Sequence, residues 1–248
     1  MLPVTAKHRD LSLTTLPQGT LVTACDSCGA VGEKPGDVLR VPARFTGRFT
    51  ARVALMEVLA FGAEVVTAID AVACEMEPTG REIIRGIRDE LESAGVDPAV
   101  LTGSTEENFP TSMTALGMTV VGWKERQEGR PLWEPSRPGD RVVCIGLPQV
   151  GAEVQLDHNT AMVSYADLRR FRTLPGLREI VPVGSHGICW EAEQLAAYNG
   201  LTFVPEPHPE LDVHKSAGPA TCAIAVLSPE AAAEALTLPR VRQAGYLQ

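Results

Sequence analysis

Residues 101–110 read Leu-Thr-Gly-Ser-Thr-Glu-Glu-Asn-Phe-Pro, so two carboxylates and an amide follow the small residues Gly103 and Ser104. Neighbouring carboxylates repel each other unless water or a cation separates them, and Mg²⁺ prefers carboxylate oxygens. We therefore expect a turn here that binds a cation and a phosphate, between the end of a strand and an apolar segment. The alternative is an acidic loop that is only solvated.

A second acid, Asp26, follows an apolar and β-branched run. Residues 19–25 read Gly-Thr-Leu-Val-Thr-Ala-Cys, which predicts a strand that delivers Asp26 to its end. The glycine-rich segment 29–37 comes next and contains Lys34. It predicts a loop flexible enough to bring backbone N–H groups to a ligand. Because no GxxxxGK[ST] motif occurs in the chain, this loop is not a Walker A loop.

Residues 50–61 are apolar nearly all round and are followed by Gly62, which predicts a buried helix of about three turns. Glu57 lies in the middle of this segment. A lone buried carboxylate is costly unless it is paired, hydrogen-bonded or bound to a cation. Two interpretations remain open: Glu57 is a metal ligand, or it forms a buried pair with Arg48 or Arg52.

The rest of the chain predicts an α+β protein without a regular βαβ alternation. Thr79-Gly-Arg-Glu82 is typical of a capping box and predicts an amphipathic helix that ends at Gly95. The polar, proline-containing segment 123–140 separates a predicted N-terminal mixed α/β domain, 1–122, from a C-terminal domain of sheet and helices, 141–248. Further strands are predicted at 117–122, 141–147 and 221–227, and further helices from Ser164 to Phe171, at 188–199 and after Ser228.

The composition narrows the class of protein. The 248 residues are 44% hydrophobic with a net charge of −9, which argues against a nucleic-acid partner because such partners need a basic surface. We find no signal-peptide pattern and no run of about 18 apolar residues, so we expect a cytoplasmic protein without a membrane span. The six cysteines are scattered through apolar stretches, which favours reduced thiols over a disulfide framework.

Cys25-Asp-Ser-Cys28 has the CxxC spacing of redox and zinc sites. No second CxxC and no histidine pair completes a set of four zinc ligands. We therefore favour Asp26 as the chemical residue of this segment and keep a redox or metal role of the two thiols as the alternative.

The order of these motifs resembles the superfamily of aminoimidazole-ribonucleotide synthetase, thiamine-monophosphate kinase and selenide water dikinase. The resemblance covers most of the chain. Its motifs are Arg9-Asp10-Leu-Ser-Leu13, Val22-Thr-Ala-Cys-Asp26, Ala54-Leu-Met-Glu57 with Phe61-Gly-Ala63, Gly103-Ser-Thr-Glu106, and Gly139-Asp140 before the predicted strand that starts the C-terminal domain. The chain departs from the pattern in its single Asp10, in Glu57 where an Asp is expected, and in Ser185-His-Gly187.

Within this superfamily the chain looks like the α-ribazole kinase group. The likeness lies in Cys-Asp-Ser-Cys-Gly-Ala-Val-Gly (25–32), Arg-Val-Ala-Leu-Met-Glu (52–57) and Thr-Gly-Ser-Thr-Glu-Glu-Asn (102–108). That group phosphorylates the benzimidazole nucleoside salvaged for the lower ligand of cobalamin. The resemblance thus implies transfer of phosphate from ATP to the 5′-hydroxyl of α-ribazole.

The resemblance also implies an ATP site between two N-terminal domains that pair their sheets in a homodimer. We expect Asp10, Asp26, Glu57 and Glu106 to hold Mg²⁺, because phosphoryl transfer depends on positioning and charge neutralisation. Asp26, Glu107 and Lys34 are the expected catalytic residues, with Lys34 meeting a phosphate and Glu107 acting on metal-bound water or the acceptor. The expected nucleotide-binding residues are Asp10, Ser27, Gly29, Gly32, Lys34, Gly103, Ser104, Thr105 and Asn108.

The second domain offers weaker candidates for a nucleoside pocket. His186 precedes a predicted helix and suits either a contact to substrate or phosphate, or an ordinary loop histidine. The turn 215–218 and the pair His158 and Asn159 are open to the same two interpretations. Trp123, Trp133 and Trp190 are each able to stack a base.

Rival functions remain. The same ATP site would serve a synthetase that phosphorylates an amide or carbonyl oxygen, or a kinase for another vitamin or nucleoside. A non-enzymatic nucleotide-binding module would leave the acids as surface residues.

Overall fold

The computed structural model describes residues 3–248, which divide into two compact units. The first unit comprises residues up to 59 together with 63–126, and the second comprises 60–62 and 127–248. The segment 123–140 spans this boundary, but Trp123–Glu125 are not linker. They form the end of strand β8 (Ala115–Glu125), because Lys124 and Glu125 pair with Thr20 and Gly19.

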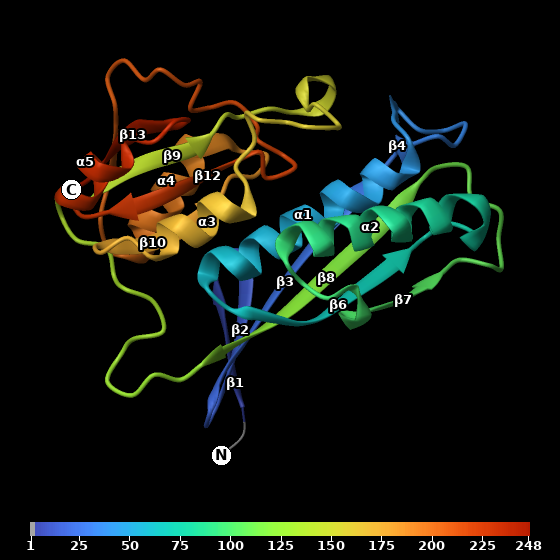
Figure 1. Cartoon of the computed structure of the whole chain (residues 1–248), viewed down its shortest axis with the longest axis horizontal. Helices are drawn as coiled ribbons and strands as arrows, with labels where there is room; N and C mark the ends of the chain where they lie inside the picture. The colour runs from blue at the N-terminus through green and yellow to red at the C-terminus, as the bar shows by residue number, and fades with distance from the viewer. Residues whose placement is uncertain (1–2) are drawn as a thin grey trace. The chain divides into compact units, whose positions relative to one another are not determined.

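The first unit is a six-stranded sheet in the order β1-β2-β3-β8-β6-β7 with two helices on one face (Figure 1). All neighbouring strands are antiparallel except the edge pair β6 and β7. The remaining elements are β1 (Val4–His8), β2 (Leu11–Leu16), β3 (Gly19–Gly29), β4 (Val31–Gly32), β5 (Leu39–Arg40), α1 (Ala43–Phe61), β6 (Glu64–Val72), η1 (Met76–Gly80), α2 (Arg81–Ala94), η2 (Pro98–Val100) and β7 (Leu101–Thr105).

Strand β3 is longer than its apolar run. The prediction that Asp26 stands at a strand end is wrong, because β3 continues to Gly29 and pairs with β8 as far as Ala115. The run of apolar residues ends at Cys25, but backbone pairing does not depend on side-chain polarity. Asp26 therefore lies within the sheet.

Helix α1 begins at Ala43, seven residues before the predicted start at Thr50. The extra turns of the helix pack on α2. Gly47 and Gly86 lie at this crossing, where an added Cβ would overlap the carbonyl oxygens of Ile83 and Arg44, respectively. Two absent side chains thus let the helices approach closely.

Two local predictions for the 75–110 region also fail. Residues 101–105 form strand β7 and not a turn, because they extend the sheet beside β6. The Thr79 side chain does not cap α2, since the π-helical turn η1 already accepts the Arg81 N–H at Met76 O. Thr79 Oγ1 instead donates to Glu75 Oε1 at 2.6 Å.

The second unit is a five-stranded sheet in the order β10-β12-β9-β13-β11, with helices around it (Figure 1). Every residue of the interior strand β12 is buried, so both faces of the sheet are covered there. The predicted caps are confirmed: Ser164 accepts from Asp167 N, and Ser228 from Ala231 N. Its elements are β9 (Arg141–Gly146), η3 (Gly151–Glu153), α3 (Tyr165–Arg172), β10 (Leu177–Pro182), α4 (Gly187–Tyr198), β11 (Phe203–Pro205), β12 (Cys222–Leu227), α5 (Pro229–Ala235) and β13 (Val241–Leu247).

The predicted mixture of sheets and helices is confirmed in both units. Over residues 3–248, no helix combines the length and the apolar character needed to cross a membrane.

Candidate functional site

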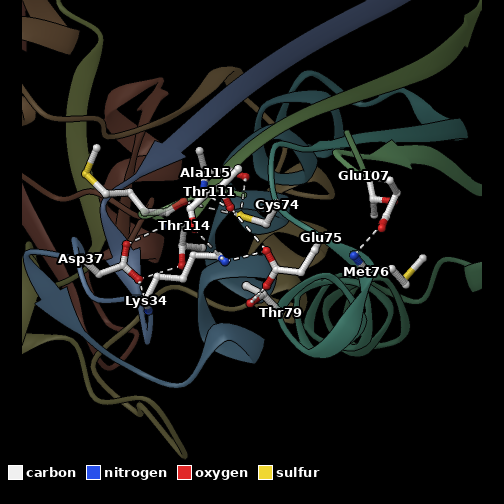
Figure 2. Close-up of polar contacts among 12 residues, drawn as sticks. Lys34, Asp37, Cys74, Glu75, Met76, Thr79, Glu107, Thr111, Thr114 and Ala115 are labelled. Atoms are coloured by element: carbon white, nitrogen blue, oxygen red, sulfur yellow. Dashed lines mark hydrogen bonds and ion pairs between the residues drawn. The ribbon is translucent and has the colours of Figure 1, made fainter. Parts of the chain in front are cut away.

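The glycine-rich segment 29–37 is held in place by an ion pair (Figure 2). Lys34 Nζ lies 2.6 Å from Glu75 Oε2 and also donates to the carbonyl oxygen of Thr111 at 3.2 Å. Burial of Glu75 opposes ionisation, but the hydrogen bonds from Lys34 and Thr79 outweigh it and lower the Glu75 pKa to about 2. Lys34 therefore serves as an internal anchor in this structure and does not point to an open phosphate site.

Asp37 completes the anchoring of the segment. Its Oδ1 accepts from Thr114 N, and its Oδ2 accepts from Thr114 Oγ1 and Lys34 N, each at 2.7 Å. Burial alone would raise the Asp37 pKa, but these bonds lower it below its usual range. We call Lys34, Asp37, Glu75, Thr111 and Thr114 the anchor network.

The backbone of the same segment is also occupied, which corrects the expectation of a flexible loop. Ala30 N donates to Thr114 O, and Gly36 N to Ser112 O, both at 2.8 Å. Gly32 is buried, and a Cβ there would overlap Thr114 Oγ1. Gly32 is therefore required by the anchor network, whereas Ser27 and Gly29 lie on the last part of β3.

A row of paired residues crosses the sheet. Asp26 on β3 and Asp70 on β6 both pair with Met118 on β8, and Asp70 also pairs with Gly103 on β7. Residues that pair directly project to the same face, here the face of the buried Met118. Asp26 and Asp70 thus lie two strands, or roughly 10 Å, apart between their Cα atoms. We call Asp26, Met118, Asp70 and Gly103 the strand row.

The two carboxylates of the strand row differ electrostatically from those of the anchor network. Burial raises the pKa of Asp26, and a backbone hydrogen bond from Ser27 only partly opposes this. Burial likewise raises the pKa of Asp70 against a backbone hydrogen bond from Ser104. Both groups lack the cation or the set of donors that would favour ionisation.

Glu57 is buried and forms an ion pair with Arg9, an arginine that sequence reasoning did not consider as its partner. Arg9 Nη1 lies 3.6 Å from Glu57 Oε2, whereas Arg48 and Arg52 contact Glu90 on α2 at 2.9 and 3.3 Å. The hairpin between β1 and β2 presents Arg9, with φ 53°, at the turn that ends in the exposed Asp10. The position of Arg9 is set by this turn, which helix spacing could not reveal.

The acids of the segment 106–108 are used locally. Glu106 Oε1 accepts from Asn108 N at 2.6 Å and from Phe109 N at 3.2 Å. Glu107 Oε1 accepts from Met76 N at 2.7 Å and from Thr105 Oγ1 at 2.9 Å, as Figure 2 shows for Met76. These bonds shape the turn after β7, which lies at the opposite edge of the sheet from β1.

The predicted metal residues therefore fall into two places. Asp10 lies in the hairpin beside β3, where Arg9 pairs with Glu57, and Asp26 lies within β3. Glu106 follows β7, three strands away from β3. Within residues 3–248, no group of three or more His, Cys, Asp and Glu side chains is placed to hold a metal.

Cys25 and Cys28 do not form a joint site. Both are free thiols on one extended strand, where odd and even positions project to opposite faces. Cys25 is exposed, whereas Cys28 is half-buried and its pKa is raised by burial. The CxxC spacing is therefore not the geometry of a redox or zinc pair.

The candidates of the second unit have ordinary structural partners. The rings of His186 and Trp190 lie with centroids 4.7 Å apart, and Lys215 forms an ion pair with Glu153 at 2.6 Å. The Asn159 amide donates to Gln149 Oε1 at 2.8 Å. His158 is exposed with φ 52°, which is typical of a turn. Trp123 lies on β8 of the first unit.

Sequence reasoning missed Asp37, Glu75 and Asp70. Asp70 had a signal: β6 alternates, and Asp70 stands at a buried position between Ala68 and Val72. Asp37 and Glu75 had none, because the partners that tie them to the rest of the unit, Thr114 and Lys34, are 77 and 41 residues away in sequence.

Comparisons with known proteins agree with this architecture. Residues 11–123 match the family of AIR synthase related proteins, N-terminal domain. A search by sequence among curated proteins gives no match.

Solved structures share the fold of the whole chain. AaThiL complexed with AMPPCP and TMP has a TM-score of 0.66 at 12% identity, over 96% of this chain and 84% of that one. Thiamine-monophosphate kinase from Stenotrophomonas maltophilia has a TM-score of 0.62 at 18% identity, over 99% and 88%. Phosphoribosylformylglycinamidine synthase II from Thermotoga maritima has a TM-score of 0.64 at 17% identity, over 99% of this chain but only 43% of that one.

Proposed function

We propose that this chain is an ATP-dependent small-molecule kinase of the AIR synthase-related superfamily. The observation that carries the proposal is the match of residues 11–123 to that N-terminal domain, together with the likeness of fold to AaThiL, which was solved with AMPPCP and TMP. AMPPCP is an ATP analogue, so the likeness supports a nucleotide site in this chain.

Mg²⁺ is the implied metal, and the donor set suits it. Mg²⁺ keeps several waters and is held by one or two carboxylates together with substrate phosphates, so a complete protein cage is not needed. Asp26 fits this demand because burial raises the pKa of its carboxyl group and, among residues 3–248, no cation offsets that effect. Asp10 is exposed nearby, and Glu57 would contribute if it exchanged Arg9 for the metal. The ion would supply charge neutralisation on the phosphates.

The remaining roles belong to polar groups that orient reactants. Ser27, Gly29, Gly103, Ser104, Thr105 and Asn108 would bind the nucleotide through backbone and side-chain donors. Lys34 would meet a phosphate only after leaving Glu75, so we assign it a role that follows nucleotide binding. Glu107 would orient the acceptor, and Glu106 would contact metal-bound water, once each gives up its present hydrogen bonds.

We further propose that the acceptor is the 5′-hydroxyl of α-ribazole. Support comes from the segments 25–32, 52–57 and 102–108, whose likeness to the α-ribazole kinase group separates this chain from thiamine-monophosphate kinases. Such a role belongs to cobalamin lower-ligand salvage in the cytoplasm. Ser185-His-Gly187 also departs from the thiamine-monophosphate kinase pattern, which argues against thiamine monophosphate as the acceptor.

A homodimer through the open face of the N-terminal sheet is part of the proposal. Val66 and Ile69 on β6 are 52% and 40% exposed, and apolar side chains on a sheet face favour burial against a partner. Ile69→Asp should yield a monomer in size-exclusion chromatography. Val38→Asp, at an 88% exposed position in the loop before β5, should leave the oligomeric state unchanged.

The kinase proposal is tested by ATP consumption with Mg²⁺ and a panel of acceptors, with the products identified by mass. The panel contains α-ribazole, thiamine monophosphate, ordinary nucleosides and formylglycinamidine ribonucleotide. A single phosphate added to α-ribazole supports the full proposal, and a phosphate ester of another acceptor corrects only the substrate.

The alternative is an ATP-dependent synthetase, favoured by the likeness to phosphoribosylformylglycinamidine synthase II. It predicts release of ADP and free phosphate with ring closure or amide chemistry and no stable phosphate ester. The mass of the product separates the two.

A further inference from the structure

Asp70 is a buried carboxylate with an unused oxygen. The residue is 4% exposed, and its Oδ1 is buried without a hydrogen-bond partner. A backbone hydrogen bond from Ser104 is the one that acts on the carboxyl group. A buried acceptor left unsatisfied costs about 1–3 kcal/mol, and more when it is charged. A bound ion that completes the group is one explanation for an unsatisfied acceptor in a native fold.

The other acids around residues 101–110 are more exposed or fully bonded. Glu106 and Glu107 lie in the exposed turn and each accept two hydrogen bonds at Oε1, and both carboxylate oxygens of Glu75 accept hydrogen bonds, from Lys34 and Thr79. Asp70 is thus the carboxylate of this corner that has a buried oxygen without a hydrogen bond.

The carboxylate of Asp70 turns toward the edge strand β7. A Cβ at Gly103 would overlap Asp70 Oδ1 and Cγ, so the side chain fills the space that glycine leaves. Thr102, Gly103 and Ser104 are all exposed, because β7 is the last strand of the sheet. An edge strand with one neighbour opens more readily than a central one, which gives a small ligand a route to Oδ1.

We propose that Asp70 is a cation-binding residue: its Oδ1 contacts the divalent metal that accompanies the nucleotide, directly or through one water. A hard oxygen donor at a desolvated position matches the preference of Mg²⁺ and Mn²⁺. The inference rests on the proposed function, which supplies the metal and the phosphates that complete its coordination. It assigns to Asp70 the role that the sequence suggested for Glu106.

The test is Mn²⁺ binding to the full chain in the presence of AMPPCP, measured by electron paramagnetic resonance and titration calorimetry. Asp70→Asn is compared with wild type, with Asp26→Asn, and with Glu64→Gln as an exposed acid on the same strand. We expect Asp70→Asn to weaken Mn²⁺ binding by about tenfold or more, as removal of a residue supporting a metal does. Glu64→Gln should bind as wild type does.

Thermal unfolding of the metal-free proteins supplies a second readout. Asp70→Asn should melt at or above the wild-type temperature, because the amide removes an uncompensated carboxylate. Asp37→Asn, at an equally buried but fully bonded position, should melt several degrees lower. The metal-induced rise in melting temperature should shrink in Asp70→Asn.

Two results would overturn the inference while leaving the kinase proposal intact: wild-type Mn²⁺ affinity in Asp70→Asn, or a fall in its metal-free melting temperature as large as that of Asp37→Asn. If the wild-type protein with AMPPCP binds no Mn²⁺, the metal requirement of the proposed function itself fails, and the role of Asp70 fails with it.

Discussion

The anchor network and the strand row use the same residue type in opposite ways. Asp37 accepts three hydrogen bonds and Glu75 is paired with Lys34, so their pKa values are lowered despite burial. Asp26 and Asp70 are desolvated without equivalent partners, so their pKa values are raised. Satisfied acids stabilise a fold, whereas underused buried acids mark candidate ligand sites. Burial alone therefore does not identify a functional carboxylate. What distinguishes it is whether its oxygens have hydrogen-bond or ion-pair partners.

The largest effect should come from Asp26→Asn. Loss of one metal-holding charge should lower kcat for ATP turnover by about a hundredfold or more. The melting temperature should stay close to wild type, because Asp26 has few partners to lose. Steady-state kinetics on folded protein checks this, and full turnover by the variant would place Asp26 with the structural acids.

Asp37→Asn should show the reverse pattern. The amide cannot accept from Thr114 N, Thr114 Oγ1 and Lys34 N together, so we expect a loss of about 2–3 kcal/mol in the free energy of unfolding. Urea unfolding measures it. Turnover per folded molecule should change little, and a selective loss of activity at unchanged stability would contradict the comparison.

The two regions should respond to pH with opposite signs. Glu75 has a pKa lowered from 4.5 to about 2, so its contribution is complete above about pH 4.5 and is lost as the pH falls toward 2. Asp26 and Asp70 have raised values, so the folded state holds protons that the unfolded state releases. Their ionisation therefore reduces stability as the pH rises through and above 3.8.

Unfolding free energies measured from pH 2 to 6 separate these contributions. In Glu75→Gln, the free energy of unfolding should fall less steeply as the pH drops toward 2. In Asp70→Asn, it should decline less as the pH rises above 3.8. Identical profiles for both variants would remove the electrostatic distinction.

The smallest effect is expected from Cys25→Ser combined with Cys28→Ser. Because the thiols face opposite sides of β3, the double variant should keep ATP turnover within about twofold of wild type. A loss far beyond that range would return the CxxC segment to the candidate site.

Part of the order of elements could be predicted because it depends on local patterns, whereas strands β1, β2, β6, β10, β11 and β13 were not predicted. The runs at 19–25, 117–122, 141–147 and 221–227 and the caps at Ser164 and Ser228 lie where the structure has strands and helix starts. The predictions were wrong where the boundary of an element depends on contacts with a segment distant in sequence. The first turns of α1 depend on α2, and the last residues of β3 depend on pairing with β8.

The candidate site was predictable in part for the same reason. Acids such as Asp26 and Glu57 stand out in apolar runs, but their partners come from the fold: Glu57 meets Arg9 through a hairpin, and Lys34 meets Glu75 across 41 residues. Asp70 was visible as a polar residue on the buried side of an alternating strand. Only the structure distinguishes it from Glu106 and Glu107, whose Oε1 atoms accept hydrogen bonds, whereas Asp70 Oδ1 is buried without one.

The crossing of α1 and α2 at Gly47 and Gly86 has a consequence for how this sequence tolerates change. Neither glycine lies on the strand row, yet each sets how closely one helix packs against the other. A single methyl group at either position would push the two helices apart, and Glu57 would move with α1. We therefore expect many substitutions to be tolerated near Asp26, whereas positions 47 and 86 must remain glycine for the two helices to keep their packing.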